Sequence, residues 1–127
     1  MIYEMKLTTE DFEDIVLDRK HIEIRLYDHK RQGISIGDEI DFINLRSPLE
    51  RVRVRVKSLL REDSFSDLLE KHELSEMTSR FTKFEDYLIK IYSRYTPEKE
   101  KKNGILGIEI ELIDGNLNHS TMGAIAA

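Results

Sequence analysis

Hydrophobic residues occupy every second position in several short segments of the chain, a pattern typical of half-buried β-strands. The alternation predicts strands over residues 3–7, 22–27, 40–45, 51–60 and 106–112. The fourth is the clearest, because three valines alternate with four cations between Arg51 and Lys57 and a helix would not separate them in this way. The chain therefore contains at least five short strands.

Hydrophobic residues at helical spacing separate these strands and predict three helices. The first begins near Thr8 and ends at Lys20, with cations in its last turn. The second begins at Ser64, and the third begins at Thr82, which would form a capping box with the acidic residue three positions later. Residues 98–104 are predicted to be a solvated loop.

The predicted order of elements is β-α-β-β-β-α-α-β. This order lacks a regular strand–helix alternation, which argues against a doubly wound parallel sheet. It favours an α+β fold, a small mixed β-barrel whose open ends are covered by flanking helices. We expect one domain over residues 1–113 and a poorly ordered C-terminal tail over 114–127, where no period is found.

Composition narrows the classes of function. The chain has no cysteine, which excludes disulfides, thiolate zinc sites and a cysteine nucleophile, and it fits a reducing compartment. Its four histidines show no metal-ligand spacing, so we predict no metal and no cofactor. No apolar run reaches membrane-spanning length and the N-terminus is too polar for a signal peptide, so we expect a cytoplasmic protein without a membrane partner.

Charge is unevenly distributed along the chain. The net charge of -5 argues against general binding of polyanions. Residues 18–61, however, carry 11 Lys and Arg against 7 Asp and Glu, a local balance of +4. This basic region favours one localised site for an anionic ligand, although charges also gather on solvated strand faces. The cations of residues 51–57 either protect a strand edge from pairing with other chains or contact phosphate.

The candidate chemistry lies where the first helix gives way to the second strand. If the aliphatic face of that strand is buried, Glu23, Arg25 and Tyr27 share the opposite face. Glu23 and Arg25 could form an ordinary surface ion-pair network with Lys20. Alternatively, Arg25 contacts a phosphate or base edge and Lys20 adds a positive charge, while Glu23 orients Lys20 or accepts a hydrogen bond from a base amino group. Tyr27 either stacks on a base or packs on the sheet. A lysine flanked by Arg19 and Arg25 could also be catalytic.

The stretch from Arg19 to Arg25 resembles the signature Gly-x-Lys-x-x-Glu-x-Arg of the ASCH domain family, a branch of the PUA-like barrels. Lys20, Glu23 and Arg25 match its polar positions, and Asp18 stands where glycine is usual. The Gly-Asp turn within residues 34–42 and the strand within 104–110 resemble two further segments of the family. The resemblance implies a PUA-like barrel whose cleft is lined by the motif.

The same resemblance implies a ligand for that cleft. RNA or a nucleotide is the expected partner, held by Arg19, Lys20, Glu23, Arg25 and Tyr27. The alternative is an amidohydrolase acting on N4-acetylcytidine or a related modified nucleoside, as in one small bacterial branch. Its catalytic residues would be Lys20, Glu23 and Glu76, where Glu23 occupies the position of that branch's threonine and Glu76 corresponds to its distant glutamate.

Overall fold

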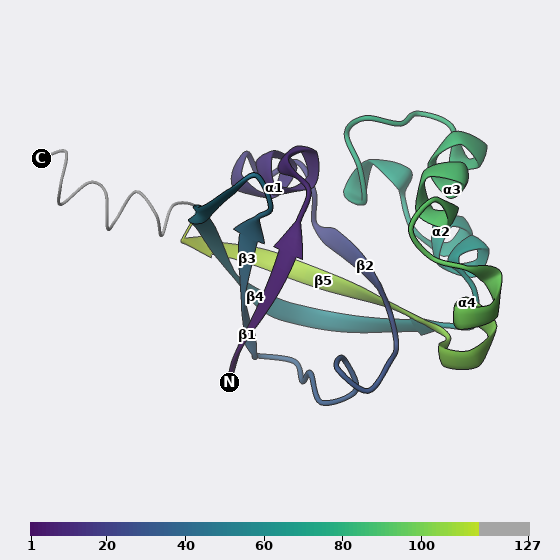
Figure 1. Ribbon diagram of the computed structural model, residues 1–127, viewed down its shortest axis with the longest axis horizontal. Helices are drawn as coiled ribbons and strands as arrows, with labels where there is room; N and C mark the ends of the chain where they lie inside the picture. The colour runs from purple at the N-terminus through teal and green to yellow at the C-terminus, as the bar shows by residue number, and fades with distance from the viewer. Residues whose placement is uncertain (115–127) are drawn as a thin grey trace, which may run out of the picture.

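The computed structural model describes residues 1–114 of the 127-residue chain as one curled sheet with helices at one end and along one side (Figure 1). The strands follow the order β1-β3-β4-β5-β2, with β1 and β3 parallel and every other neighbouring pair antiparallel. Their bounds are Ile2–Leu7 for β1, Ile22–Leu26 for β2, Glu39–Asn44 for β3, Ser47–Glu62 for β4 and Ile105–Asp114 for β5.

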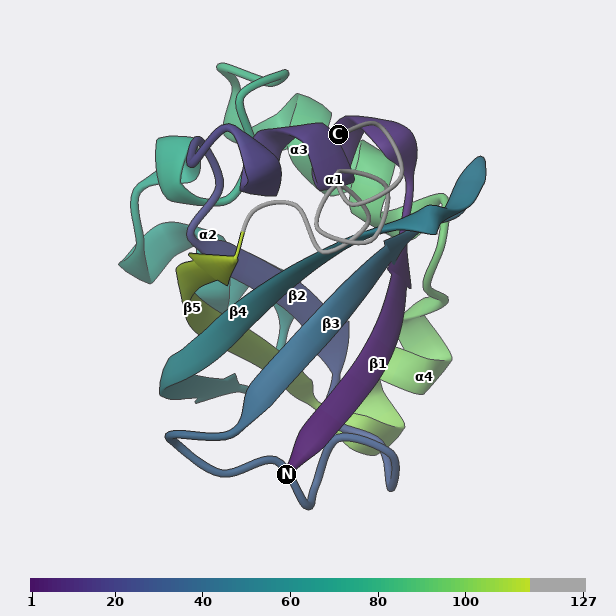
Figure 2. The same cartoon turned by 90° about the vertical axis from the view of Figure 1, so that its left-hand side faces the viewer.

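Within residues 1–114, four α-helices and one short 3-10 helix cover this sheet. Their bounds are Thr9–Val16 for α1, Phe65–Lys71 for α2, Leu74–Glu76 for the 3-10 helix, Phe84–Tyr92 for α3 and Pro97–Asn103 for α4. Figure 2 shows α1 across one end of the sheet, above β1, β3 and β4. The predicted α+β fold, a small mixed β-barrel with flanking helices, and its order of strands and helices are confirmed; the sheet is curled into a half-barrel, and α4 is an addition.

Helix α4 replaces the solvated loop predicted over 98–104. Thr96 caps it by accepting a hydrogen bond from the Lys99 amide, and Pro97 occupies its first turn, where proline is well tolerated. Gly104 ends the helix at φ 69°, a conformation that suits glycine. The loop prediction was wrong because the charged sequence of α4 has little apolar periodicity, while its capping residues are those of a helix.

Two predicted helix ends were also wrong. Helix α1 ends at Val16 rather than Lys20, and Asp18 adopts the left-handed conformation at φ 58°. The cations therefore lie in the connection to β2 and not in the last turn of α1. Helix α3 begins at Phe84 after Lys83, with no side-chain cap, so the predicted capping box at Thr82 does not form.

Two hydrophobic cores lie on opposite faces of the sheet. One fills the inside of the curl and includes Phe12 of α1, Phe42 of β3 and Val54 of β4. The other packs helices α2 and α3 against β2 and includes Ile24 and Phe65. Because β2 is covered on both sides, its polar residues are shielded from solvent, and Glu23 is only 5% exposed. The alternating pattern had suggested that one face of this strand is polar and open to solvent.

Arg51, Arg53 and Arg55 of β4 are paired with carboxylates on β1 and β3. Arg53 donates from Nε and Nη2 to the two carboxylate oxygens of Asp41, at 2.7 and 3.0 Å. Arg51 donates to Glu4 at 2.6 Å. Strand β4 has a neighbouring strand on each side and is not a sheet edge, so the interpretation of its cations as protection of an edge was wrong. They form cross-strand ion pairs on the outer face of the sheet.

No helix within residues 1–114 is long and apolar enough to cross a membrane. Asp114 is the last residue of β5, and the rest of the predicted tail, 115–127, lies outside the described residues.

Candidate functional site

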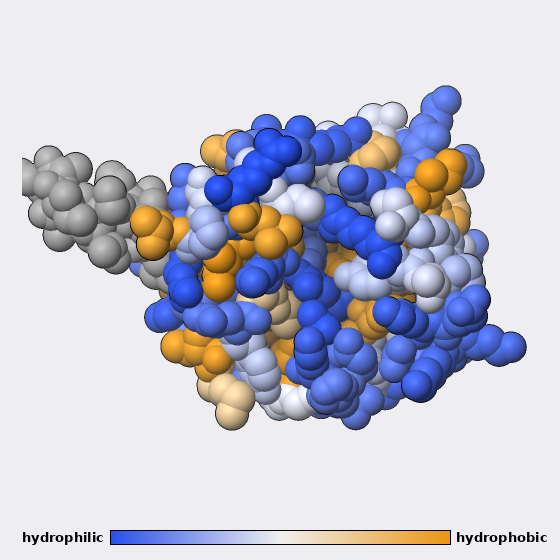
Figure 3. Space-filling model, viewed as in Figure 1, coloured by the Kyte–Doolittle hydropathy of each residue, from blue (hydrophilic) through white to orange (hydrophobic). Residues whose placement is uncertain are grey.

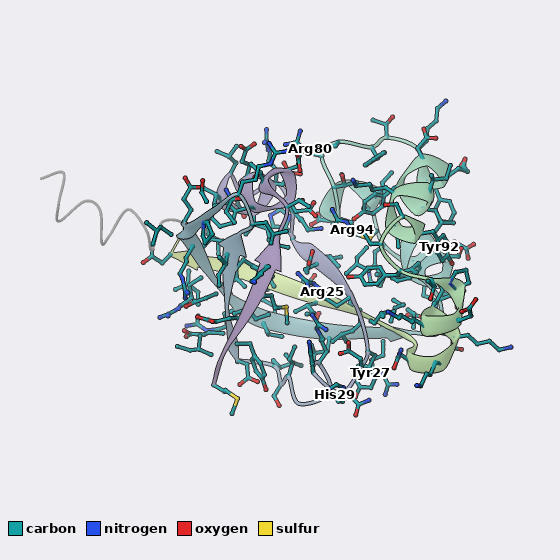
Figure 4. All side chains as sticks on the ribbon, in the orientation of Figure 1. Arg25, Tyr27, His29, Arg80, Tyr92 and Arg94 are labelled. Carbon is teal, nitrogen blue, oxygen red and sulfur yellow. The ribbon has the colours of Figure 1, made fainter. Side chains whose placement is uncertain are left out.

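A cleft of about 230 Å³ lies between α1 and α3, with residues of β2 at its floor. Side chains from four parts of the chain line it. These are the start of α1, the Lys20–Ile24 segment, the loop over 78–81, and α3 with the turn that follows it. Figure 4 shows Arg80 and Arg94 in the region between α1 and α3, on the face that Figure 3 shows to be largely hydrophilic. The predicted cleft beside the first helix is thus present, and α3 forms its opposite wall.

Three charged residues of the motif form a continuous chain that begins at the floor of this cleft, where Lys20 and Glu23 line the cavity and Arg25 contributes no surface to it. Lys20 Nζ lies 3.3 Å from Glu23 Oε1, and Arg25 Nε donates to Glu23 Oε2 at 2.7 Å. The Lys20, Glu23 and Arg25 side chains are 1%, 6% and 13% exposed, so the surface ion-pair interpretation does not describe them. We refer to Lys20, Glu23 and Arg25 as the floor triad.

Both ends of the floor triad hold backbone from distant elements. Lys20 Nζ donates to the Met77 carbonyl at 2.6 Å, which ties the triad to the loop that forms one wall of the cleft. Arg25 Nη2 donates to the Lys6 carbonyl at 2.8 Å. Because β1 and β2 are the two edges of the sheet, this bond connects those edges across the gap that remains in the half-barrel.

The floor triad is fully ionised at neutral pH. Burial disfavours the charged form of Lys20, but the neighbouring Tyr87 and Glu23 oxygens outweigh it and raise the pKa of the amine. Burial likewise disfavours the Glu23 carboxylate, yet the charges of Arg25 and Lys20 lower its pKa overall. The paired charges therefore favour the ammonium form of Lys20, which can bind anions or polarise a carbonyl.

The connection between α1 and β2 sets the position of Lys20. After Leu17 caps the helix, the left-handed Asp18 turns the chain, and the amides of Arg19 and Lys20 both donate to the Asp14 carbonyl. The Asp14 carboxylate, which is buried, accepts from the Ser79 hydroxyl at 2.7 Å. Asp14 thus fastens the wall loop to α1, and the aspartate at position 18 adopts the backbone conformation that glycine would provide.

The walls of the cleft combine cations with aromatic rings. Arg80, Lys90 and Arg94 supply the positive charge. The aromatic residues are Phe81, Tyr87 and Tyr95. Burial raises the pKa of both tyrosines, which keeps their phenols neutral and able to donate hydrogen bonds. Cations beside aromatic faces are the combination that proteins use to hold phosphates and unpaired bases.

Sequence reasoning found the floor of the cleft and missed most of its walls. One signal was available, because Lys90 and Arg94 lie four residues apart and such a spacing places two side chains on one helical face. Phe81 lies in a loop next to Arg80, with its ring centroid 5.5 Å from that of Tyr87. No sequence pattern indicated that this loop packs against α1. The contact is a hydrogen bond from the Ser79 hydroxyl to the Asp14 carboxylate, two residues that are far apart in the sequence.

Four of the predicted site residues do not line the cleft, and one of them, Arg25, is joined to its floor through Glu23. Arg19 pairs with Asp14 at 3.2 Å. The Cζ atom of Arg61 lies 3.7 Å from the centroid of the Tyr27 ring, and Tyr27 contributes no surface to the cavity. Glu76 lies 2.7 Å from His21 Nδ1 and lines a separate, shallow surface depression. The structure thus brings together Lys20, Glu23 and Arg25, of which Lys20 and Glu23 line the cavity, and it places Arg19, Tyr27 and Glu76 apart from them.

Comparisons with known proteins agree with this architecture. The family model of the ASCH domain matches residues 5–114. The hypothetical protein PH0355 is similar in crystal structure, at 36% identity and a TM-score of 0.80, over 89% of this chain and all of that one. The solution structure of PF0455 from Pyrococcus furiosus is 39% identical, with a TM-score of 0.72, over 89% of this chain and 98% of that one.

A more distant structure shows the same fold. The S128A mutant of the ASCH protein from Zymomonas mobilis is 14% identical, with a TM-score of 0.61, over 89% of this chain and 73% of that one. No curated protein matches the chain. The curled five-stranded sheet, the motif at the junction of α1 and β2 and the family match over nearly all described residues lead to one conclusion: the chain belongs to the ASCH domain family.

Proposed function

We propose that the cleft between α1 and α3 binds single-stranded RNA or a nucleotide. The observation that supports this most is the composition of one cavity. Its floor carries the buried ammonium group of Lys20, and its walls add three cations and three aromatic rings. The lining has four cations against three carboxylates, Glu10, Asp11 and Glu23, in a protein with a net charge of -5, and this local positive balance beside aromatic rings favours an anionic ligand that also carries a flat ring.

The parts of the cleft have different roles in this proposal. The exposed cations of the walls, Arg80, Lys90 and Arg94, contact phosphate. The rings of Phe81 and Tyr95 contact the base, because every base offers a face for stacking. The floor triad presents Lys20 toward the ligand, while Arg25 holds the Glu23 carboxylate in place with one bond and the β1 edge with another.

Binding of a fluorescently labelled single-stranded oligoribonucleotide, followed by anisotropy at two salt concentrations, tests the proposal. Lys90→Ala should weaken binding about fivefold and reduce the slope of log K against log salt by about 0.7, the value of one phosphate contact on a single strand. Lys101→Ala on α4 removes the same charge from an exposed position outside the cleft and should have less than half of this effect on the slope. Equal effects of the two variants, or no binding by the native protein, would overturn the proposal.

The amidohydrolase alternative has less support from the geometry. Lys20 is held protonated, and Glu76 pairs with His21 outside the cleft. A protonated lysine could still polarise an acetyl carbonyl, but the cavity holds no carboxylate at the floor except Glu23, whose oxygens are already paired with Lys20 and Arg25. We expect incubation with N4-acetylcytidine to release no cytidine, and turnover that is lost in Lys20→Met would establish the alternative instead.

A further inference from the structure

We propose that the mouth of the cleft contains two phosphate subsites, at Arg94 and Arg80, which the carboxylates of Asp11 and Glu13 occupy in the free protein. The ligand therefore carries at least two phosphate groups, and it displaces these carboxylates when it binds. This inference rests on the proposed function and specifies its ligand class.

Two ion pairs join α1 to arginines that line the cleft, and of the two carboxylates Asp11 also lines it. Arg94 Nη1 lies 3.6 Å from Asp11 Oδ2, and Arg80 Nη2 lies 3.5 Å from Glu13 Oε2. The arginine side chains are 39% and 43% exposed. In each pair an anionic group that belongs to the protein faces a guanidinium at the entrance of a cavity whose floor is also cationic.

These pairs differ from the hydrogen-bonded arginine–carboxylate pairs of the protein, and they resemble the 3.5 Å pair of Arg55 with Glu39. Arg25 and Arg53 donate well-directed hydrogen bonds of 2.7 Å to Glu23 and Asp41. The two pairs at the mouth are longer and form no hydrogen bond among the described residues. The guanidinium groups of Arg80 and Arg94 thus keep donors for a ligand, and a phosphate can offer each of them the forked contact that guanidinium groups favour.

Lys90 adds a third cation to the same entrance. It lines the cleft, is exposed, and has no ion pair among residues 1–114. Glu10 lies near both Lys90 and Arg80, so the first turn of α1 faces the opposite wall with acidic side chains along its length. An incoming polyanion competes with this acidic turn for the same cations, and exposed ion pairs yield at small cost.

Two kinds of ligand present the required pair of phosphates. A single RNA strand offers successive phosphodiesters, and a nucleoside diphosphate offers two linked phosphates. A nucleoside offers none. Binding experiments with a labelled single-stranded oligoribonucleotide, a nucleoside diphosphate and a nucleoside therefore distinguish the source of the shared chemistry.

Neutralising the competing carboxylates should strengthen binding, a result that damage to the fold cannot produce. We expect Asp11→Asn and Glu13→Gln each to tighten binding of the phosphate-bearing probe roughly twofold to fivefold, the range that corresponds to an exposed ion pair. The control is Glu4→Gln on the outer face of the sheet. It changes the net charge equally and frees Arg51 from a 2.6 Å pair, but it lies outside the cleft. Its effect should be smaller than twofold.

The outcomes separate the two levels of the proposal. If Asp11→Asn and Glu13→Gln tighten binding of the oligoribonucleotide alone, the ligand is a single RNA strand. If they also tighten binding of the nucleoside diphosphate, the result supports a nucleotide. Weaker binding in Asp11→Asn and Glu13→Gln, or a change no larger than that of Glu4→Gln, overturns the subsites and leaves the proposed function intact. Absence of binding by the native protein with every probe overturns the proposed function and the subsites together.

Discussion

The buried floor triad should make Glu23 one of the most sensitive positions for stability. Glu23→Gln removes the only negative charge between Lys20 and Arg25, whose side chains are 1% and 13% exposed, and leaves two buried cations facing each other. Breaking a buried ion pair by removing one partner costs about 3–5 kcal/mol. For a domain of this size, we expect the midpoint of thermal unfolding to fall by roughly 10–20 °C.

Urea unfolding of Glu23→Gln, fitted for both the midpoint and the m-value, gives the loss in free energy of unfolding directly. Glu4→Gln is the matched control, since Glu4 pairs with Arg51 at 2.6 Å while the two side chains are 58% and 36% exposed. Its cost should stay below about 1 kcal/mol, because solvent screens an exposed pair. A second variant replaces the whole floor triad, as Lys20→Met, Glu23→Leu and Arg25→Met, and should recover most of the loss since no buried charge is left unpaired.

The reasoning fails if Glu23→Gln costs no more than Glu4→Gln. That result would mean that water reaches the floor of the cleft and screens the triad, in spite of its low exposure. A triple variant as unstable as Glu23→Gln would instead show that the bond from Arg25 to the Lys6 carbonyl, and not the balance of charge, is what the fold requires.

Three further predictions concern pH and the backbone. The folded-state pKa of Glu23 lies below its ordinary value of 4.5, so its contribution to stability is present above that pH and is lost as the pH falls through the folded value. The midpoint of thermal unfolding should therefore fall below about pH 4.5. This fall should be less steep in Glu23→Gln, which has no carboxyl group to protonate at this position. Asp18→Gly should change the free energy of unfolding by less than about 1 kcal/mol, whereas Asp18→Val should cost about 1–2 kcal/mol because a β-branched residue is strained at φ 58°; equal urea midpoints would contradict this. Gly107→Ala would bring its Cβ to 3.0 Å from Leu68 Cδ1 and should lower stability by about 1–3 kcal/mol in the same assay, while a neutral result would show that Leu68 can shift.

The sequence alone determined the strands, because their alternation states which side of each strand is apolar. It also indicated the junction of α1 and β2 as the candidate site, because the match of Lys20, Glu23 and Arg25 to a family signature can be read from the sequence. It could not determine that both faces of β2 are covered. Alternation distinguishes two faces of a strand but does not state what lies against the polar one, so Glu23 and Arg25 were expected near the surface.

The helix boundaries show a second limit of local patterns. The cations after α1 suit the end of a helix, yet the helix ends at Val16 because Asp18 takes a left-handed conformation and the Asp14 carbonyl accepts the next amides. In α4, the capping by Thr96 and Gly104 was readable, but its charged residues have no apolar period to suggest a helix.

Only the tertiary structure decided which residues share the cleft. Arg19 and Tyr27 are close to Lys20 in sequence, yet their partners are Asp14 and Arg61, outside the cavity. Arg94, by contrast, is more than seventy positions from Lys20 and lines the same cavity. The physical reason is that side-chain composition and spacing fix local elements, whereas a site is made where the packing of two cores brings distant elements together. The carboxylates and arginines that face each other across the cleft mouth are a product of that packing, and no local pattern contains them.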